Sequence, residues 1–158
     1  MVCPEAWGLT DREEWILFLL FAGGPKQRYN EPIAGRTRLM KELFLLKQRS
    51  PDLQDFFEFR PYKYGPHSDE ALSALRRLVE GGYVQATPGY GSEVYSLTPR
   101  GIERAVRSFN RLDERIRRRL VDIKLQFNSM PLSDLLGYVY EHFPQFASQS
   151  EYEGPLPE

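Results

Sequence analysis

Apolar residues at steps of three and four predict two amphipathic helices in the first fifty residues. The first helix begins at Thr10, which forms a capping-box pattern with Glu13, and ends at Gly23-Gly24-Pro25. The second helix begins near Thr37 and is stopped by Ser50-Pro51-Asp52. Its buried side is expected to carry Leu39, Met40, Leu43, Phe44 and Leu46, and its outer side Arg38, Lys41, Lys47 and Arg49.

The next fifty residues alternate between strand-like and helical patterns. Residues 56–60, FFEFR, form a short aromatic run that predicts a strand. Ser68 caps a third helix, and Gly81-Gly82 closes it. Two strand-like runs, residues 83–87 and 93–97, flank the glycine-containing tip PGYG, and together they predict a β-hairpin.

The remaining residues predict one long helix and one short helix. Thr98-Pro99 opens the long helix, because helices accept proline in their first turn. Its apolar stripe continues to Phe127, which corresponds to about 40 Å if the helix is unbroken. This length exceeds what the preceding residues need to cover their core, so we expect a homodimer seam. Pro131 starts a last helix that runs through His142.

The predicted element order is typical of a winged helix-turn-helix domain. It runs helix, helix, strand, helix, two-stranded hairpin, helix, and the strand at residues 56–60 lengthens the turn. We therefore expect an α+β fold that is mostly α. Residues 10–98 are assigned to the winged-helix domain and residues 99–150 to a C-terminal helical extension for dimerisation or packing. Residues 151–158 are assigned to a flexible tail.

The start of the second helix resembles a known group of proteins. Residues 35–41, GRTRLMK, followed by Phe44-Leu45-Leu46, are similar to the basic GRTRLQK-type helix start of uncharacterised archaeal and bacterial winged-helix proteins. The similarity covers about residues 12–150 and includes Tyr64-Gly65-Pro66 and Phe143-Pro144. It implies a winged-helix fold and a role as a transcriptional regulator.

A second, more distant resemblance implies a different role. Leu39, Lys41 and Gly65-Pro66 are similar to the K-L-x-K…GP pattern of the Panacea antitoxin domain. Members of that family bind toxin proteins. This resemblance therefore implies a protein-interaction module.

Charge is distributed unevenly along the chain, although the net charge is only −1. Residues 26–49 hold seven Lys or Arg residues against two acidic residues, and residues 100–119 hold eight against three. The two ends, residues 1–25 and 131–158, are acidic. The basic segments either form one positive face or pair with acidic side chains inside the molecule.

Composition favours a cytoplasmic protein without a membrane segment. Hydrophobic residues make up 41% and charged residues 27% of the chain, as in ordinary globular proteins. The longest apolar run, Trp15–Gly24, is about half as long as a membrane span, and the acidic segment Asp11-Arg12-Glu13-Glu14 precedes it. The single cysteine, Cys3, excludes an intramolecular disulfide.

Basic side chains on the second and third helices are the candidate nucleic-acid contacts. Arg36, Arg38 and Lys41 lie near the start of the second helix, where cations oppose the helix dipole. Phosphate contacts would offset this cost. Arg76 and Arg77 on the third helix are candidate base readers. The alternative for the first three is a solvated face, or ion pairs with Glu13, Glu14 and Glu42.

Several features argue against a conventional operator-reading geometry. Asp69 and Glu70 lie at the leading end of the third helix, and the tip PGYGSE contains no Lys or Arg to enter a minor groove. Tyr62 and Tyr64 are expected to pack one ring and expose the other. The arginines of residues 100–119 either follow phosphates or form a polar face paired with Glu103, Asp113 and Glu114.

No pattern in the chain indicates an enzyme. There is no phosphate-binding glycine loop and no nucleophile set, and His67 has no second ligand at metal spacing. We expect a non-enzymatic protein without a metal or cofactor. The first interpretation is a transcriptional regulator that binds double-stranded DNA as a homodimer. The alternative is an antitoxin-like or complex-assembly module that binds a protein, such as a toxin, without DNA.

Overall fold

The computed structural model describes residues 11–51, 57–89 and 91–147. The described chain has the predicted α+β class and is mostly helical. Its elements are α1 (Asp11–Phe21), β1 (Ile33–Ala34), α2 (Arg36–Gln48), β2 (Arg60–Tyr62), β3 (Gly65–His67), α3 (Asp69–Glu80), β4 (Val84–Pro88), β5 (Glu93–Leu97), α4 (Pro99–Phe109), α5 (Glu114–Phe127), α6 (Leu132–His142) and the 3-10 turn η3 (Pro144–Phe146).

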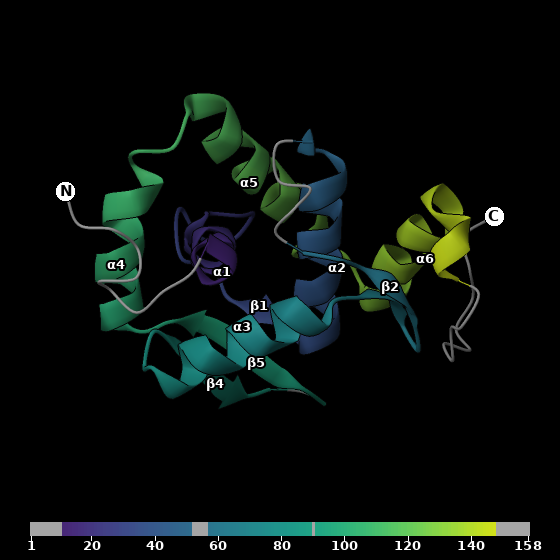
Figure 1. Ribbon diagram of the computed structural model, residues 1–158, viewed down its shortest axis with the longest axis horizontal. Helices are drawn as coiled ribbons and strands as arrows, with labels where there is room; N and C mark the ends of the chain where they lie inside the picture. Colours follow the sequence, from purple (N-terminus) through teal and green to yellow (C-terminus); the bar gives the residue numbers. More distant parts are fainter. Residues whose placement is uncertain (1–10, 52–56, 90, 148–158) are drawn as a thin grey trace.

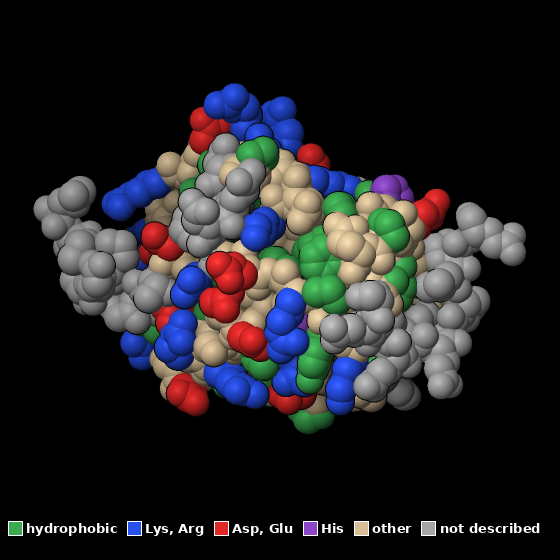
Figure 2. All heavy atoms as spheres, turned by 45° about the vertical axis from the view of Figure 1, so that its right-hand side comes forward, with side chains coloured by type: hydrophobic (Ala, Val, Ile, Leu, Met, Phe, Trp, Pro, Cys, Tyr) green, Lys and Arg blue, Asp and Glu red, His purple; other side chains and the backbone are tan. Residues whose placement is uncertain are grey.

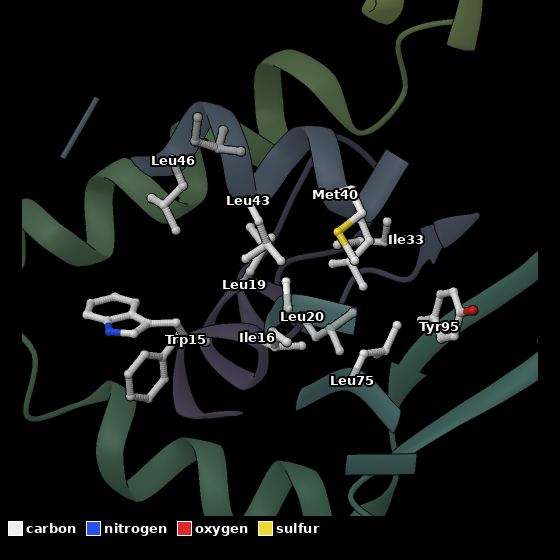
Figure 3. Close-up of a cluster of buried hydrophobic side chains, with 14 of the residues drawn as sticks. Trp15, Ile16, Leu19, Leu20, Ile33, Met40, Leu43, Leu46, Leu75 and Tyr95 are labelled. Atoms are coloured by element: carbon white, nitrogen blue, oxygen red, sulfur yellow. The ribbon is translucent and has the colours of Figure 1, made fainter. Parts of the chain in front are cut away.

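Helix α1 lies at the centre of the molecule, with α4, α5, α2 and α3 around it (Figure 1). Its residues Trp15 to Leu20 are all buried, so this helix is apolar on every side. Side chains from α1, α2, α3 and β5 converge on one hydrophobic cluster (Figure 3), and this cluster also contains residues of α5 and α6. Because α1 is covered all round, α3, α4, α5 and β5 pack directly against it.

The predicted hairpin is confirmed as β4 and β5, and it belongs to a three-stranded antiparallel sheet. The strand order is β1-β5-β4, with Ile33 opposite Tyr95 and Val84 opposite Leu97. The tip residue Tyr90 lies outside the described residues. The short strand β1 directly precedes α2, so its pairing with β5 places the start of α2 beside the hairpin.

The third helix begins and ends where the sequence predicts. The Ser68 hydroxyl group accepts a hydrogen bond from the Ala71 amide at 3.2 Å, which is the expected N-cap geometry. Gly81 caps the other end of α3. The predicted first, second and last helices are also confirmed, although Thr10 lies outside the described residues, as does the tail 151–158.

The strand predicted at residues 56–60 is wrong in position. Phe57 and Phe59 are in no strand, and the observed strand β2 starts at Arg60 and pairs with β3. The Phe59 ring packs edge-on against Phe44 of α2, with centroids 5.3 Å apart. These aromatic residues are therefore used for core packing, and Gly65, with φ +87°, makes the turn that sets the strand pairing.

The long fourth helix is broken, which corrects the prediction of an unbroken rod. Helix α4 ends at Phe109, and α5 starts at Glu114, where the Asp113 carboxylate accepts a hydrogen bond from the Arg115 amide at 2.8 Å. The two helices take different directions around α1 (Figure 1). Leu120 and Ile123 of the apolar stripe are fully buried inside the chain, so the length argument for a dimer seam no longer holds. The homodimer itself stays a prediction.

A buried lysine joins α5 to the end of α1. Lys124 is fully buried, and its Nζ donates hydrogen bonds to the carbonyl oxygens of Leu20 at 2.8 Å and Ala22 at 2.9 Å. It also donates to the Glu31 carbonyl oxygen. The last carbonyl groups of a helix have no partner within that helix, so Lys124 satisfies groups that burial would otherwise leave unpaired.

Replacing Lys124 with methionine is expected to lower the free energy of unfolding by about 3–5 kcal/mol, because three buried carbonyl groups lose a donor. The matched control is Lys26→Met, since Lys26 is an exposed lysine in the loop after α1. Urea unfolding monitored by circular dichroism measures both variants. A loss for Lys124→Met as small as that for Lys26→Met would contradict the structural role of Lys124.

Candidate functional site

Three open cavities of about 540, 230 and 240 Å³ share Arg36 in their lining. The first lies between the start of α2, the hairpin end near Ser92 and the start of α6. The second lies between α3 and β5, and the third lies between α2 and the β2–β3 hairpin. Of the predicted contact residues, Arg36 is therefore the one that borders all three cavities.

The start of α2 has no side-chain cap. Its N-cap residue is Gly35, which has φ +95° and provides no side-chain oxygen. The first amide groups of a helix lack partners within the helix, so their positive partial charge faces outward here. Arg36 is exposed directly beside them. This combination of amide groups and a guanidinium group is suited to binding an anion.

The predicted outward position of Arg38 is wrong. Arg38 is only 9% exposed, and its Nη1 donates a hydrogen bond to the Phe127 carbonyl oxygen at 2.9 Å. Burial lowers its pKa, while the nearby Glu42 carboxylate acts in the opposite direction. Helical spacing alone placed this residue outside, but α5 and α6 both pack against α2 and cover that side.

Glu42, one of the predicted ion-pair partners, is fully buried between charged side chains. Burial raises its pKa, while Lys124 and Arg38 lower it. Neither of its carboxylate oxygens has a hydrogen-bond partner among the described residues. The charged side chains of Arg38 and Glu42 on α2 are therefore buried, and they cannot contact a polyanion at the surface.

Lys41 is also buried, which corrects its predicted outward position. It is 3% exposed, and its Nζ donates a hydrogen bond to the Pro66 carbonyl oxygen at 3.0 Å. Burial lowers its pKa from 10.5 to about 7. A lysine that is only partly protonated at neutral pH and occupied by a backbone carbonyl group is a poor phosphate ligand. The β2–β3 hairpin that covers Lys41 is the feature that sequence spacing missed.

The two candidate base readers of α3 lie in different environments. Arg76 is exposed and lines the second cavity together with Arg36. The Nε of Arg77 lies 2.6 Å from the Oε1 of the buried Glu13, so this arginine connects α3 to α1. Of the five predicted contact residues, Arg36 and Arg76 are the two that share an open surface.

The acidic residues at the start of α3 are engaged with other groups. Asp69 lies 3.4 Å from Arg60 and 3.1 Å from His67, and its hydrogen bond with Arg60 is the main cause of its lowered pKa. Glu70 accepts a hydrogen bond from the Glu58 amide at 2.9 Å. Arg60 thus offsets the local negative charge that argued against DNA at this end of α3.

The β2–β3 hairpin adds exposed groups that are not among the five predicted contact residues. Tyr62 and Tyr64 are 38% and 45% exposed, so the expectation that one ring packs and the other is exposed is wrong. Lys63 lies between them in the turn. The Arg60 guanidinium group stacks over the Tyr62 ring at 4.7 Å. The signal for this site is the run RPYKYG, in which basic and aromatic residues alternate.

The arginines of residues 100–119 mostly have partners within the chain. Arg107 pairs with Glu103 at 3.8 Å, Arg118 with Glu114 at 3.0 Å and Arg115 with Asp113 at 3.4 Å. Arg104 pairs with Glu14 of α1, and the Arg100 guanidinium donates a hydrogen bond to the Tyr83 hydroxyl at 2.9 Å. These contacts agree with a polar, internally paired face.

One face of the molecule shows the same mixture of charges. In Figure 2, Lys and Arg side chains alternate with Asp and Glu over one part of the surface, and hydrophobic side chains gather in another part. Within the described ranges, no group of three or more His, Cys, Asp or Glu side chains is placed to hold a metal ion. None of the described helices combines the length and apolar character that crossing a membrane requires.

Lys41→Met is expected to change how stability depends on pH. Because the pKa of Lys41 is about 7 in the folded chain and 10.5 in the unfolded chain, the folded state binds fewer protons between these values. Burying this amine therefore lowers the free energy of unfolding. The loss has its full size below pH 7 and becomes smaller as the pH rises. Relative to the variant, the original protein should gain up to about 1.4 kcal/mol per pH unit in this window. Urea unfolding between about pH 7 and 9 measures the difference.

The control for this experiment is Lys63→Met, which removes an exposed lysine from the neighbouring hairpin. It should keep the pH dependence of the original protein. If Lys41→Met and the original protein show parallel stability curves, Lys41 is not the buried, partly neutral amine described above.

No protein-family model matches the chain, and no curated protein is significantly similar to it in sequence. A function is therefore inferred from the residues of this chain alone.

Proposed function

We propose that this protein is a winged-helix DNA-binding protein that regulates transcription. The order α1, β1, α2, α3, β4, β5 and the sheet order β1-β5-β4 support a winged-helix arrangement, with the β2–β3 hairpin inserted between α2 and α3. Such a domain presents α3 as its reading helix and the β4–β5 hairpin as its wing. Because a fold alone does not determine a function, the contact residues must carry the proposal.

The observation that carries the proposal is the shared exposure of Arg36 and Arg76 on one cavity. Arg36 stands beside the uncapped amide groups of α2, where a DNA phosphate group would meet both the amides and the guanidinium. Arg76 lies on the outer side of α3, where it would reach base edges in the major groove. Lys63 on the β2–β3 hairpin, which lines the third cavity together with Arg36, would add a phosphate contact.

The low net charge of the protein and the acidic residues near the two arginines limit DNA binding to a few local contacts. The net charge is −1, and Glu80 and Glu93 line the same cavity as the two arginines. The pairing of Asp69 with Arg60 removes one unfavourable charge at the start of α3. We therefore expect a weak dependence of DNA affinity on salt, since each phosphate contact contributes a slope of only about −0.9 in log K against log salt concentration.

The double variant Arg36→Ala/Arg76→Ala is expected to weaken binding to random duplex DNA by about tenfold or more and to reduce the salt slope by about one to two units. Both side chains are exposed, so the fold should be preserved. Fluorescence anisotropy at about 50 mM salt and above measures the affinity, because nonspecific electrostatic binding is visible at low salt.

The matched control is Arg111→Ala/Arg118→Ala, which removes the same charge from exposed positions around the α4–α5 connection. It should leave DNA affinity nearly unchanged. Equal losses in the two double variants would indicate an effect of net charge alone, and an unchanged affinity in Arg36→Ala/Arg76→Ala would contradict the proposed contact surface.

A second candidate function is a protein-interaction module, such as an antitoxin that binds a toxin. The exposed side chains of Tyr62 and Tyr64 favour it, because aromatic side chains are enriched at protein interfaces. Absence of any DNA retardation at about 50 mM salt, together with a copurifying protein, would favour this function over DNA binding. Substituting Tyr62 and Tyr64 with serine should then release the partner while leaving the fold intact.

A further inference from the structure

The largest of the three cavities, of about 540 Å³, is within the size range of small-molecule sites. It lies next to the DNA-contact cavity and shares Arg36, Glu93 and Tyr95 with it. Its walls come from the start of α2, the β5 side of the hairpin, the β2–β3 turn and the start of α6. Elements far apart in sequence therefore meet at one hollow, which is a common location for a ligand.

One end of this cavity is suited to an anion. The uncapped first turn of α2 forms part of the wall, and the Arg36 and Arg38 side chains line it. Arg38 is 9% exposed, and its Nε has no hydrogen-bond partner among the described residues. This end of the cavity therefore offers an oxyanion the amide groups of the first turn of α2 and the exposed Arg36 guanidinium group.

Tyr95 gives a second and independent indication of a ligand. Its side chain lines the cavity and is 7% exposed. In Figure 3 its hydroxyl group points away from the hydrophobic cluster, and this oxygen is not among the enclosed, unpaired polar atoms of the described residues. A tyrosine that is nearly buried normally places its hydroxyl against a partner. Here the open side of the cavity is the place where such a partner would lie.

The other end of the cavity is apolar. Tyr64, Leu132 and Leu136 line it, and Tyr64 and Leu132 are 45% and 42% exposed. A ligand for the whole cavity therefore needs an apolar body as well as an anionic group. Inorganic phosphate, or one phosphate group of a nucleic acid, would use only the cationic end.

The net charge of the side chains that line the cavity determines which anions it favours. Arg36 and Arg38 bring two positive charges, and Glu93 brings one negative charge, so one positive charge is left over. This balance favours a monoanion such as a carboxylate over a phosphate dianion. The hydroxyl groups of Thr37 and Ser92 in the same wall provide further donors for carboxylate oxygens.

We propose that this cavity binds a small organic carboxylate. Its carboxylate group would lie between the start of α2, the Arg36 guanidinium group and the Tyr95 hydroxyl, and its apolar body would lie against Leu132 and Leu136. This ligand site goes beyond DNA binding and does not depend on it.

Isothermal titration calorimetry of the full chain with benzoate, benzyl alcohol and inorganic phosphate tests the proposal, with no DNA present. Benzoate is expected to bind at least about tenfold more tightly than the alcohol, which lacks the charge, and than phosphate, which lacks the apolar body. Equal binding of benzoate and benzyl alcohol would overturn the anionic end. Tighter binding of phosphate than of benzoate would overturn the organic ligand and would assign the cationic end to a nucleic-acid phosphate group.

Three variants locate the binding. Tyr95→Phe removes only the hydroxyl group and should weaken benzoate binding about fivefold, and Arg36→Gln should weaken it about tenfold. Leu132→Glu places a carboxylate against the ligand and should weaken it at least tenfold. Arg118→Gln, on α5, is the matched control and should bind as the original protein does. Arg36 and Leu132 are exposed, so loss of folding is not expected to obscure the result.

Benzoate affinities that are unchanged in Tyr95→Phe, Arg36→Gln and Leu132→Glu would overturn the site. Thermal unfolding of each variant, followed by circular dichroism, verifies that the folded protein is titrated. Because DNA is absent from the titration, a failure of the DNA-binding proposal leaves this outcome unaffected, and the reverse also holds.

Discussion

The buried ammonium group of Lys124 is the contact on which the arrangement of the first half of the chain depends. It joins α5 to the last carbonyl groups of α1 and to the loop that follows α1. In that loop the Glu31 carboxylate accepts hydrogen bonds from the Lys26 amide at 2.5 Å and from the Asn128 side chain at 2.5 Å. The loop is thereby held from both sides. Its end is β1, and β1 leads directly into the uncapped start of α2.

This contact carries an electrostatic cost. Burial lowers the pKa of Lys124, and the carboxylates of Glu42 and Glu31 partly oppose this shift. A buried ion pair adds little net stability, because desolvation offsets most of the Coulomb attraction, but removing one partner is strongly destabilising. Charged groups inside α2 and α5 therefore specify how these helices dock more than they strengthen the core.

The same docking decides which basic side chains face the solvent. Helix α2 is covered by α5, α6 and the β2–β3 hairpin, so Arg38 and Lys41 are directed to backbone carbonyl groups of neighbouring elements. Arg36, the first residue of α2, is exposed, and it lines both the cavity shared with Arg76 and the large cavity beside Tyr95. One arginine therefore connects the proposed DNA contact with the proposed ligand site.

The local patterns of the chain determine most of its elements. The Ser68 cap, the glycines after α3 and the apolar run of α1 act over a few residues, so the sequence alone predicts these helices and the β4–β5 hairpin. Arg36 and Arg76, two of the predicted contact residues, are exposed in the structure. Where a residue's environment is made by its immediate neighbours, reading the sequence is sufficient.

Only the tertiary structure decides the remaining features. Helices α4 and α5 both pack on α1 from different directions, and the burial of Arg38 and Lys41 follows from elements more than twenty residues away. Periodicity shows which side of a helix is apolar, but it cannot show that a charged side is also covered. The cavity beside Tyr95 likewise cannot be predicted from periodicity, because its walls come from four separate segments of the chain.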